Sequence, residues 1–278
     1  MKLATLRTAD GTRVARLEGD EYVDLGVADV GALLSQHGGL EHAASADGER
    51  TPASQAQLAP VVPAPGKILC VGLNYRHHIQ EMGREIPQYP TLFAKYPEAL
   101  VGPTDPIELP PETEQLDWEA ELAVVVGRSV RRASEEEAAA AIAGFAVLND
   151  VTARDWQYRT LQWLQGKTFE ATSPLGPVLV TPDELPGTVR PVLDLSCSVD
   201  GETVQKASTG DLVFDPVALV QYISTMVTLR PGDVIATGTP GGVGHARKPA
   251  RYLSDGARLV TEISGIGRLE NSVAAAGA

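Results

Sequence analysis

Two glutamates, Glu119 and Glu121, lie two positions apart at the start of an apolar segment. In a β-strand, residues two positions apart point to the same face, with Cα atoms about 7 Å apart. The next residues on that face, Ala123 and Val125, are apolar, which predicts that both carboxylates face a buried region. Burying two like charges is costly unless a positive charge lies between them. The alternative is an exposed strand end with two solvated acids.

Asp150 adds a third carboxylate. It follows the apolar segment GFAVLN and begins the polar segment DVTARD, a position at which a strand directs a side chain into a cleft. Three carboxylates with no neighbouring cluster of Cys or His describe a site made of oxygen ligands. Hard cations suit such a site and zinc does not. The acids therefore predict a site for Mg²⁺ or Mn²⁺, with Ca²⁺ as a further candidate.

A histidine and a glutamate in the segment NYRHHIQEM, His78 and Glu81, are spaced i, i+3. On a helix that spacing places them on one face within contact range. A carboxylate beside an imidazole fixes its tautomer and raises its basicity, which is how a general base is prepared. The alternative is a solvated helix face. We also take Arg76, in the same segment, as a candidate substrate-binding residue.

Lys167 and a glycine-rich segment are weak signals when each is taken alone. Lys167 lies between a predicted helix and a predicted strand, and most lysines are solvated charges. The segment TGTPGGVG, residues 237–244, fits neither glycine motif for nucleotides, because Lys248, Pro249 and a turn-rich stretch follow it. Its backbone N–H groups and threonine hydroxyls are more typical of a cradle for a carboxylate.

The composition limits the class of protein. The chain has 278 residues and a formal net charge of −13, which disfavours nucleic acid and anionic membranes as partners. Cys70 and Cys197 lie in apolar segments and predict buried thiols in a reducing compartment. No stretch approaches the ~20 apolar residues of a membrane span, and the first residues lack an apolar signal segment. We expect a cytoplasmic enzyme.

The pattern along the chain predicts an α+β, mainly β fold with two parts. Residues 1–62 are predicted to form a small N-terminal α+β domain, with short strands, a helix at 27–36 and a loop at 42–57. A proline-rich boundary follows, and residues 66–273 are predicted to form a mixed β-roll. In that second part we predict strands at 67–73, 91–95, 119–127, 144–149, 192–199, 233–236 and 258–263. We predict helices starting at Asn74, after the cap Ser134 for about nine residues, at 153–163 and at 216–228.

Taken together, the motifs resemble the fumarylacetoacetate hydrolase family, and in particular its small acylpyruvate and fumarylpyruvate hydrolases. The resemblance rests on five segments in one order: G-x-N-Y-x-x-H-x-x-E (72–81), E-x-E-L (119–122), N-D-V-T-x-R-D (149–155), G-K-T-F (166–169) and T-G-T-P-x-G-V-G (237–244). It implies the β-roll of that family, in which homodimers are usual. The first sixty residues carry no matching motif, and no fourth metal carboxylate is evident.

The resemblance also implies roles for single residues. The metal ligands of the family fall on Glu119, Glu121 and Asp150. Its His–Glu dyad falls on His78 and Glu81, and its active-site lysine on Lys167. Its substrate-anchoring loop falls on Gly238 and Thr239, and Gln157 begins a polar segment suited to a second substrate carboxylate.

The implied reaction is hydrolysis of a C–C bond in an acylpyruvate, a 2,4-dioxo acid such as fumarylpyruvate. His78, oriented by Glu81, would activate water, and Lys167 would neutralise the developing negative charge. The alternatives within the family are an oxaloacetate decarboxylase and an isomerase or decarboxylase of the 2-hydroxyhepta-2,4-diene-1,7-dioate type. A non-catalytic protein that binds oxo acids is disfavoured, because a binder needs no base.

Overall fold

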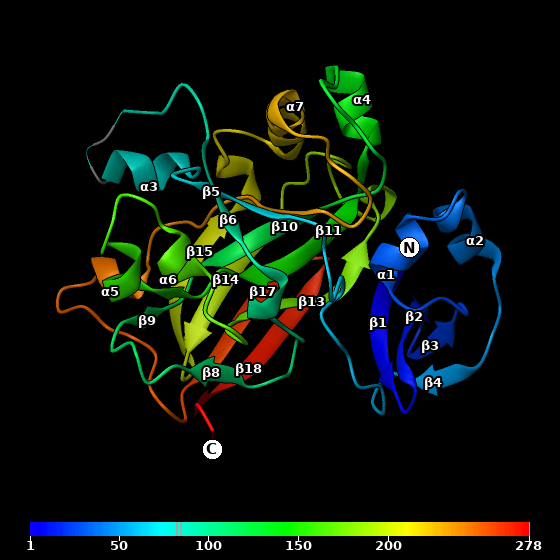
Figure 1. The fold of residues 1–278 in the computed structure, drawn as a ribbon, viewed down its shortest axis with the longest axis horizontal. Coiled ribbons are helices and arrows are strands. Elements are labelled where there is room, and N and C mark those ends of the chain that lie inside the picture. Colours follow the sequence, from blue (N-terminus) through cyan, green and yellow to red (C-terminus); the bar gives the residue numbers. More distant parts are fainter. Residues whose placement is uncertain (82, 84, 278) are drawn as a thin grey trace.

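The computed structural model describes residues 1–277 except 82 and 84, and leaves out the side chain of Glu81. The strands are, in chain order, β1 (Lys2–Thr8), β2 (Gly11–Glu18), β3 (Glu21–Asp24), β4 (Arg50–Pro52), β5 (Ile68–Gly72), β6 (Thr91–Lys95), β7 (Leu100–Val101), β8 (Ile107–Leu109), β9 (Leu116–Asp117), β10 (Ala120–Val126), β11 (Ile142–Asn149), β12 (Thr152–Ala153), β13 (Ser173–Val180), β14 (Asp194–Val199), β15 (Glu202–Ser208), β16 (Val234–Ala236), β17 (Arg258–Ile263) and β18 (Gly267–Ala275). The helices are α1 (Val30–Leu34), α2 (Gly39–Ser45), α3 (Arg76–Glu81), α4 (Glu135–Ala140), α5 (Arg154–Gln157), α6 (Leu164–Lys167) and α7 (Pro216–Met226), with 3-10 turns η1 (Pro97–Ala99), η2 (Pro182–Glu184), η3 (Thr209–Asp211) and η4 (Gly244–Ala246). The fold is α+β and mainly β, as predicted (Figure 1).

Within the described residues the larger sheet has 11 strands in the order β4-β3-β2-β1-β13-β11-β10-β16-β5-β6, with β7 paired beside β13. β10 is antiparallel to both β11 and β16, with Ala120 opposite Asn149 at the end of β11 and Ala123 opposite Ala236 at the end of β16. β5 runs parallel to β16, so its end reaches the same edge. Segments that are far apart in the sequence therefore end at one edge of the sheet.

A second sheet, in the order β15-β14-β17-β18-β8, packs against β10 and β11. The core on this side of β10 contains Leu122 and Val124, with Leu195 and Leu259 from the second sheet. The alternate residues of β10, including Ala123, pack into a different cluster that also holds buried residues of α1. Both faces of β10 are therefore buried, and a polar side chain at its start is enclosed rather than solvated.

The N-terminal strands continue the larger sheet. β1 pairs antiparallel with β13, with Lys2 opposite Val180 and Leu3 opposite Leu179. In Figure 1, β1–β4 and the helices α1 and α2 form the blue part at one side of the molecule. The loop predicted for residues 42–57 is wrong, because most of α2 and all of β4 fall there. α2 buries Ala43, and β4 pairs with β3 at the edge of the sheet. Tertiary packing therefore determines the secondary structure of this polar segment.

Three predicted helices differ from the structure. The helix predicted over 153–163 is wrong: α5 ends at Gln157, turns follow, and α6 folds back on α5. Gly166 permits this, since a Cβ there would lie 2.5 Å from backbone atoms of Ala153 and Gln157. α3 begins at Arg76 and not at Asn74, whose side-chain oxygen accepts the backbone N–H of Phe214 at 2.8 Å. The predicted helix after Ser134 is shorter, at six residues, although its capping box is present.

No helix in the described part of the chain is long and apolar enough to cross a membrane. Cys70 and Cys197 are both buried free thiols, as the apolar segments around them predict.

Candidate metal and active site

The side chains of Glu119, Glu121 and Asp150 meet at the edge where β10 begins and β11 ends. One carboxylate oxygen from each lies within 4.8 Å of the others, and all three residues are buried. The backbone N–H of Asp150 donates to the carbonyl of Glu119 at 2.8 Å, which fixes the two segments against each other. The carboxylate cluster, defined by these three residues, is thus brought together by strand pairing.

Two buried lysines compensate the carboxylate cluster. Lys167 Nζ lies 2.8 Å from both Glu119 Oε2 and Asp150 Oδ2. Lys95 Nζ lies 3.0 Å from Asp150 Oδ1 and donates to Ser173 Oγ at 2.8 Å. Burial by itself would lower the pKa of Lys167, but the charges of Asp150 and Glu119 outweigh it and raise the pKa. Lys167 is therefore a cation at neutral pH.

The carboxylate cluster fits a hard divalent cation. Its donors are all oxygens, which Mg²⁺, Mn²⁺ and Ca²⁺ prefer. Asp150 Oδ1 lies 3.0 Å from Lys95 Nζ but accepts no well-aligned hydrogen bond from the described residues, which leaves a buried oxygen able to ligate a cation. Burial, and then the charges of Asp150 and Glu119, raise the pKa of Glu121 well above its usual range. A bound cation would relieve that repulsion.

Arg154 and Asp117 are site residues that the sequence did not single out. Arg154 Nη1 lies 2.6 Å from Glu119 Oε1 and donates to Gln157 Oε1 at 3.0 Å. Arg154 Nε donates to Asp117 Oδ2 at 2.8 Å. Both could have been found from their positions in the sequence, because Arg154 stands four residues after Asp150 and Asp117 stands two before Glu119. Lys95, the last residue of β6, gave no comparable signal, because its partners come from distant segments.

Asp117 holds the end of the glycine-rich loop. Its carboxylate accepts the backbone N–H groups of Gly244 at 2.7 Å and His245 at 3.0 Å. Trp118 Nε1 donates to the carbonyl of Gly242 at 3.2 Å. A Cβ on Gly244 would lie 1.9 Å from the carbonyl oxygen of Arg251, so only glycine fits this close approach. Asp117 and Trp118, which bind the end of the loop, thus directly precede Glu119 of the carboxylate cluster in the sequence.

The start of the glycine-rich loop binds one carboxylate of the protein itself, that of Glu121. The N–H of Gly238 donates to Glu121 Oε2 at 2.7 Å. Thr239 Oγ1 donates to the carbonyl of Ala120 at 3.0 Å and accepts from Gln205 Nε2 at 2.8 Å. The structure places Gly238 on the carboxylate cluster and Thr239 beside it. Their roles toward substrate stay predictions.

A cavity of about 230 Å³ opens onto Glu119 and Lys167 and is also lined by His78, Gln157 and Thr239. Phe93 and Trp163, in edge-to-face contact at 5.3 Å, supply an apolar wall. The cavity therefore brings Glu119, one member of the carboxylate cluster, together with Lys167 and with three further predicted residues, His78, Gln157 and Thr239.

The cavity lining does not include Glu121, Asp150 or Gly238, which meet at the carboxylate cluster, and two further predicted site residues also lack a place in it. The side chain of Glu81 lies outside the described residues, so the geometry of the His78–Glu81 pair stays a prediction. Arg76 is exposed and is absent from the described residues that line the cavity. The neighbouring His77 points to a different acid, with Nδ1 2.6 Å from Asp211 Oδ1.

Comparison with known proteins agrees with the fold. The family described as Fumarylacetoacetate (FAA) hydrolase C-terminal matches residues 67–274. A mitochondrial oxaloacetate tautomerase of Rattus norvegicus is 45% identical over 223 residues, which is 80% of this chain and 71% of that protein. The mitochondrial location belongs to that protein by name, and a cytoplasmic location stays a prediction for this chain.

Solved structures share the architecture over the whole chain. A fumarylacetoacetate hydrolase from Exiguobacterium antarcticum has a TM-score of 0.88 and 34% identity, covering 99% of each chain. A 2-hydroxyhepta-2,4-diene-1,7-dioate isomerase from Mycobacterium marinum has a TM-score of 0.80 and 31% identity, covering 100% of each chain. The names of these relatives describe a tautomerase, a hydrolase and an isomerase. This chain belongs to the fumarylacetoacetate hydrolase family.

Proposed function

We propose that this chain is a divalent-cation-dependent enzyme that transfers a proton at the carbon beside the oxo group of a small 2-oxo acid, interconverting the keto and enol forms of an oxaloacetate-type substrate. The observation that carries the proposal is the cationic Lys167, bound to Glu119 and Asp150 and facing the cavity. The 45% identity to an oxaloacetate tautomerase supports this substrate class.

The residues at the base of the cavity would bind the cation and stabilise negative charge on the substrate. Glu119, Glu121 and Asp150 would hold the cation, which as a Lewis acid supplies stabilisation of negative charge on the substrate oxygens. Lys167 supplies a buried positive charge from the same end of the cavity, where a low dielectric strengthens its effect on an enolate oxygen. Phe93 and Trp163 keep water away from that end.

His78 is the proton carrier in this proposal. It lines the cavity, and an imidazole is suited to both take and return a proton near neutral pH. A tautomerase needs this reversible transfer and no attacking water. The same residue would serve the other reactions that begin with proton transfer, including dienoate isomerisation.

Hydrolysis of an acylpyruvate, with fumarylpyruvate as the type substrate, is the second candidate. It is favoured by the placement of His78 beside the cavity, where it could activate water, and by the similarity to a fumarylacetoacetate hydrolase. It differs from tautomerisation in requiring a water and in releasing pyruvate and a carboxylic acid. Oxaloacetate decarboxylation also releases pyruvate, but from oxaloacetate alone.

A substrate panel tests the proposal. The protein is assayed with oxaloacetate, acetylpyruvate and fumarylpyruvate, with Mg²⁺, with Mn²⁺ and after EDTA. Loss of the enol absorbance of oxaloacetate without pyruvate release is the expected result, and EDTA should abolish it. If the acylpyruvates release pyruvate and oxaloacetate does not react, the enzyme is a hydrolase and the tautomerase proposal is wrong. Activity that survives EDTA would contradict the cation requirement for either reaction.

A further inference from the structure

The mouth of the cavity carries an imidazole, that of His245, which the proposed reaction does not use. His245 lines the same cavity as Lys167 and Glu119. Lys167 and Glu119 are 1% and 7% exposed, whereas His245 and its neighbour Tyr158 are exposed, with Tyr158 at 57%. The buried charges therefore mark the base of the cavity, and His245 marks its rim.

Three contacts hold His245 in place, which is unusual for an exposed side chain. Its backbone N–H donates to the carboxylate of Asp117 at 3.0 Å. Its ring lies against Tyr158 with a centroid distance of 5.3 Å. Its Nδ1 lies 3.0 Å from the hydroxyl oxygen of Tyr252. A side chain that these backbone, ring and hydroxyl contacts already hold has little conformational entropy left to lose when it binds a ligand.

The contact with Tyr252 offers His245 Nδ1 a hydrogen-bond donor. Burial raises the pKa of the Tyr252 phenol, so the phenol keeps its proton at neutral pH and can donate it to Nδ1. A neutral imidazole that accepts at Nδ1 carries its own proton on Nε2. In that tautomer, His245 presents a hydrogen-bond donor, Nε2–H, at the rim.

The substrate must lie along the axis from base to rim. In the proposed function the oxo-acid end occupies the base, where the carboxylate cluster and Lys167 lie. The other end of a small substrate then reaches the rim. A donor placed there is suited to an acceptor group on the substrate, and hydrogen bonds to charged acceptors are the stronger kind.

We propose that His245 is a specificity-determining residue that donates a hydrogen bond to the distal carboxylate of a dicarboxylic 2-oxo acid. This rests on the proposed function, because that function places the oxo-acid end at the base. It distinguishes dicarboxylic substrates from acylpyruvates that end in an alkyl group. Tyr252 is the positioning residue that keeps the donor on Nε2.

Calorimetric titration of the Mg²⁺-loaded protein tests this with three ligands. Oxalate fills only the base, 2-oxoglutarate carries a distal carboxylate, and 2-oxovalerate has a methyl group in its place. Wild type should prefer 2-oxoglutarate over 2-oxovalerate by about tenfold, the usual worth of a hydrogen bond to a charged group. His245→Phe keeps the ring contact with Tyr158 and should reduce the preference to below about twofold, with oxalate affinity unchanged.

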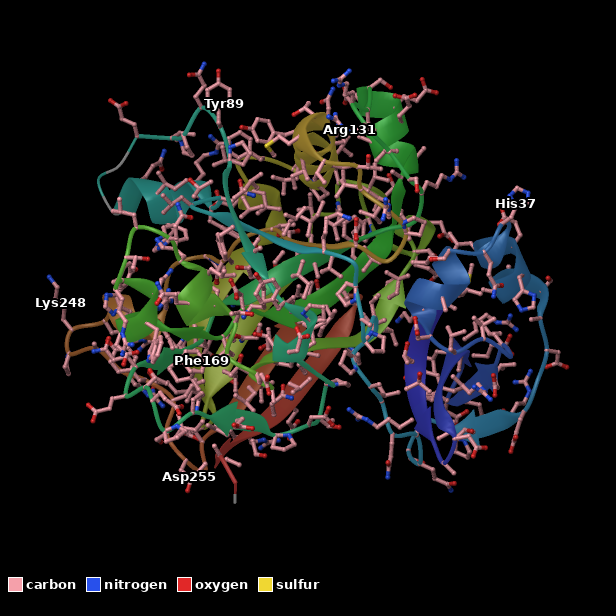
Figure 2. The ribbon with its side chains drawn as sticks, in the orientation of Figure 1. His37, Tyr89, Arg131, Phe169, Lys248 and Asp255 are labelled. Atoms are coloured by element: carbon pink, nitrogen blue, oxygen red, sulfur yellow. The ribbon has the colours of Figure 1, made fainter. Side chains whose placement is uncertain are left out.

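Two further variants separate this role from general damage. Tyr252→Phe should leave a preference of roughly threefold, because the donor remains but its proton is no longer fixed. His37→Phe is the matched control and should change nothing, since His37 lies at the opposite edge of the molecule from Lys248, three residues after His245 (Figure 2). Melting temperatures confirm that each variant is folded.

Each outcome decides one question. A preference that survives in His245→Phe, or one that is absent in wild type although oxalate binds, overturns the assignment of His245. Failure of oxalate to bind wild type in the presence of Mg²⁺ overturns the proposed function, and the assignment of His245 falls with it. Equal loss of all three ligands in a folded His245→Phe shows a structural role and also overturns the assignment.

Discussion

The three carboxylates of the cluster lie together but have different electrostatic surroundings. Burial by itself would raise the pKa of Asp150, yet the charges of Lys167 and Lys95 outweigh it and lower that pKa. For Glu121, burial and the charges of Asp150 and Glu119 outweigh the charge of Lys167 and raise the pKa. In the metal-free protein, therefore, Asp150 is the ionised member and Glu121 the member that most readily holds a proton.

This asymmetry predicts how pH affects the stability of the metal-free protein. A carboxyl whose folded pKa is raised binds more protons in the native state, so its contribution to stability is lost as pH rises above the unfolded value of 4.5. Glu121→Gln does not titrate and can still accept from Gly238. At pH 8 in EDTA, its melting temperature should exceed that of wild type by roughly 2–4 °C, or about 1 kcal/mol.

The exposed glutamate Glu262 provides the control for that experiment. Glu262→Gln should follow wild type across the pH range. With saturating Mg²⁺ the order should reverse, because the cation stabilises wild type and loses a ligand in Glu121→Gln. A Glu121→Gln variant that is less stable than wild type in EDTA at pH 8 would show that the buried carboxylate is fully compensated.

Lys167 should act on catalysis and on cation binding in opposite directions. Lys167→Met removes a positive charge 2.8 Å from oxygens of Glu119 and Asp150, so Mg²⁺ should bind about tenfold more tightly. Enol interconversion should fall by roughly 10²–10³-fold, because a charge that stabilises the enolate is lost. Calorimetry and the oxaloacetate assay give the two readouts. Weaker Mg²⁺ binding would show that Lys167 organises the ligands instead of competing with the cation.

His78→Ala should lower enol interconversion by about 10²–10⁴-fold, the usual contribution of a general base. Mg²⁺ affinity should be unchanged, because His78 is not a ligand in this proposal. Glu81→Gln should lie between wild type and His78→Ala if Glu81 orients the imidazole. His77→Ala, which removes the neighbouring ring that bonds Asp211, is the matched control. If His78→Ala reacts at the wild-type rate, His78 is not the general base, and the alternative of a solvated helix face holds.

At the scale of elements, the site depends on where strands end. β10 begins, and β11, β16 and β5 end, at one edge of the larger sheet, and the glycine-rich loop follows β16 there. The loop is held at both ends by carboxylates, Glu121 at its start and Asp117 at its finish. This arrangement explains why the loop carries glycines where it approaches other backbone.

Gly244→Ala should destabilise the protein by about 3 kcal/mol, a value typical of a severe steric change at a buried position. The added Cβ would meet the Arg251 carbonyl at 1.9 Å and displace the N–H that Asp117 accepts. Urea unfolding measures the loss. Gly176→Ala is a suitable control, since a Cβ there would make ordinary contacts of 3.5 Å with Pro103. Equal stability of the two variants would mean that the loop can move aside without cost.

Regular elements could be predicted from the sequence where one pattern decided them. β6 and β17 begin and end at the predicted residues; β17 alternates between buried and more exposed positions, and β6 begins directly after Pro90. The helix predicted over 153–163 failed because the sequence there is compatible with a helix, and only the close packing of Gly166 on α5 shows the break. The carboxylate cluster could be predicted since Glu119 and Glu121 share a strand face. Lys95 could not, because its ion pair with Asp150 joins residues 55 positions apart.

At the scale of the whole molecule, we propose a homodimer, which follows from the resemblance of the motifs to a family in which dimers are usual. Light scattering at micromolar concentration should give twice the mass of the 29.4 kDa chain. The measurement should be repeated with Mg²⁺ and with EDTA, since a cation that binds within one chain should leave the mass unchanged. A species with the mass of a single chain under both conditions would exclude the dimer.

The pairing of β5 with β16 has a consequence for how the molecule is made. β5 ends at Gly72 and its parallel partner ends at Ala236, so the edge that carries the site cannot close until most of the chain has left the ribosome. At usual synthesis rates of 5–20 residues per second, β5 waits roughly 10–30 s for that partner. During this interval the native partner available to β5 is β6, which follows it after α3. The antiparallel β5–β6 pair is thus the first part of this edge that can form.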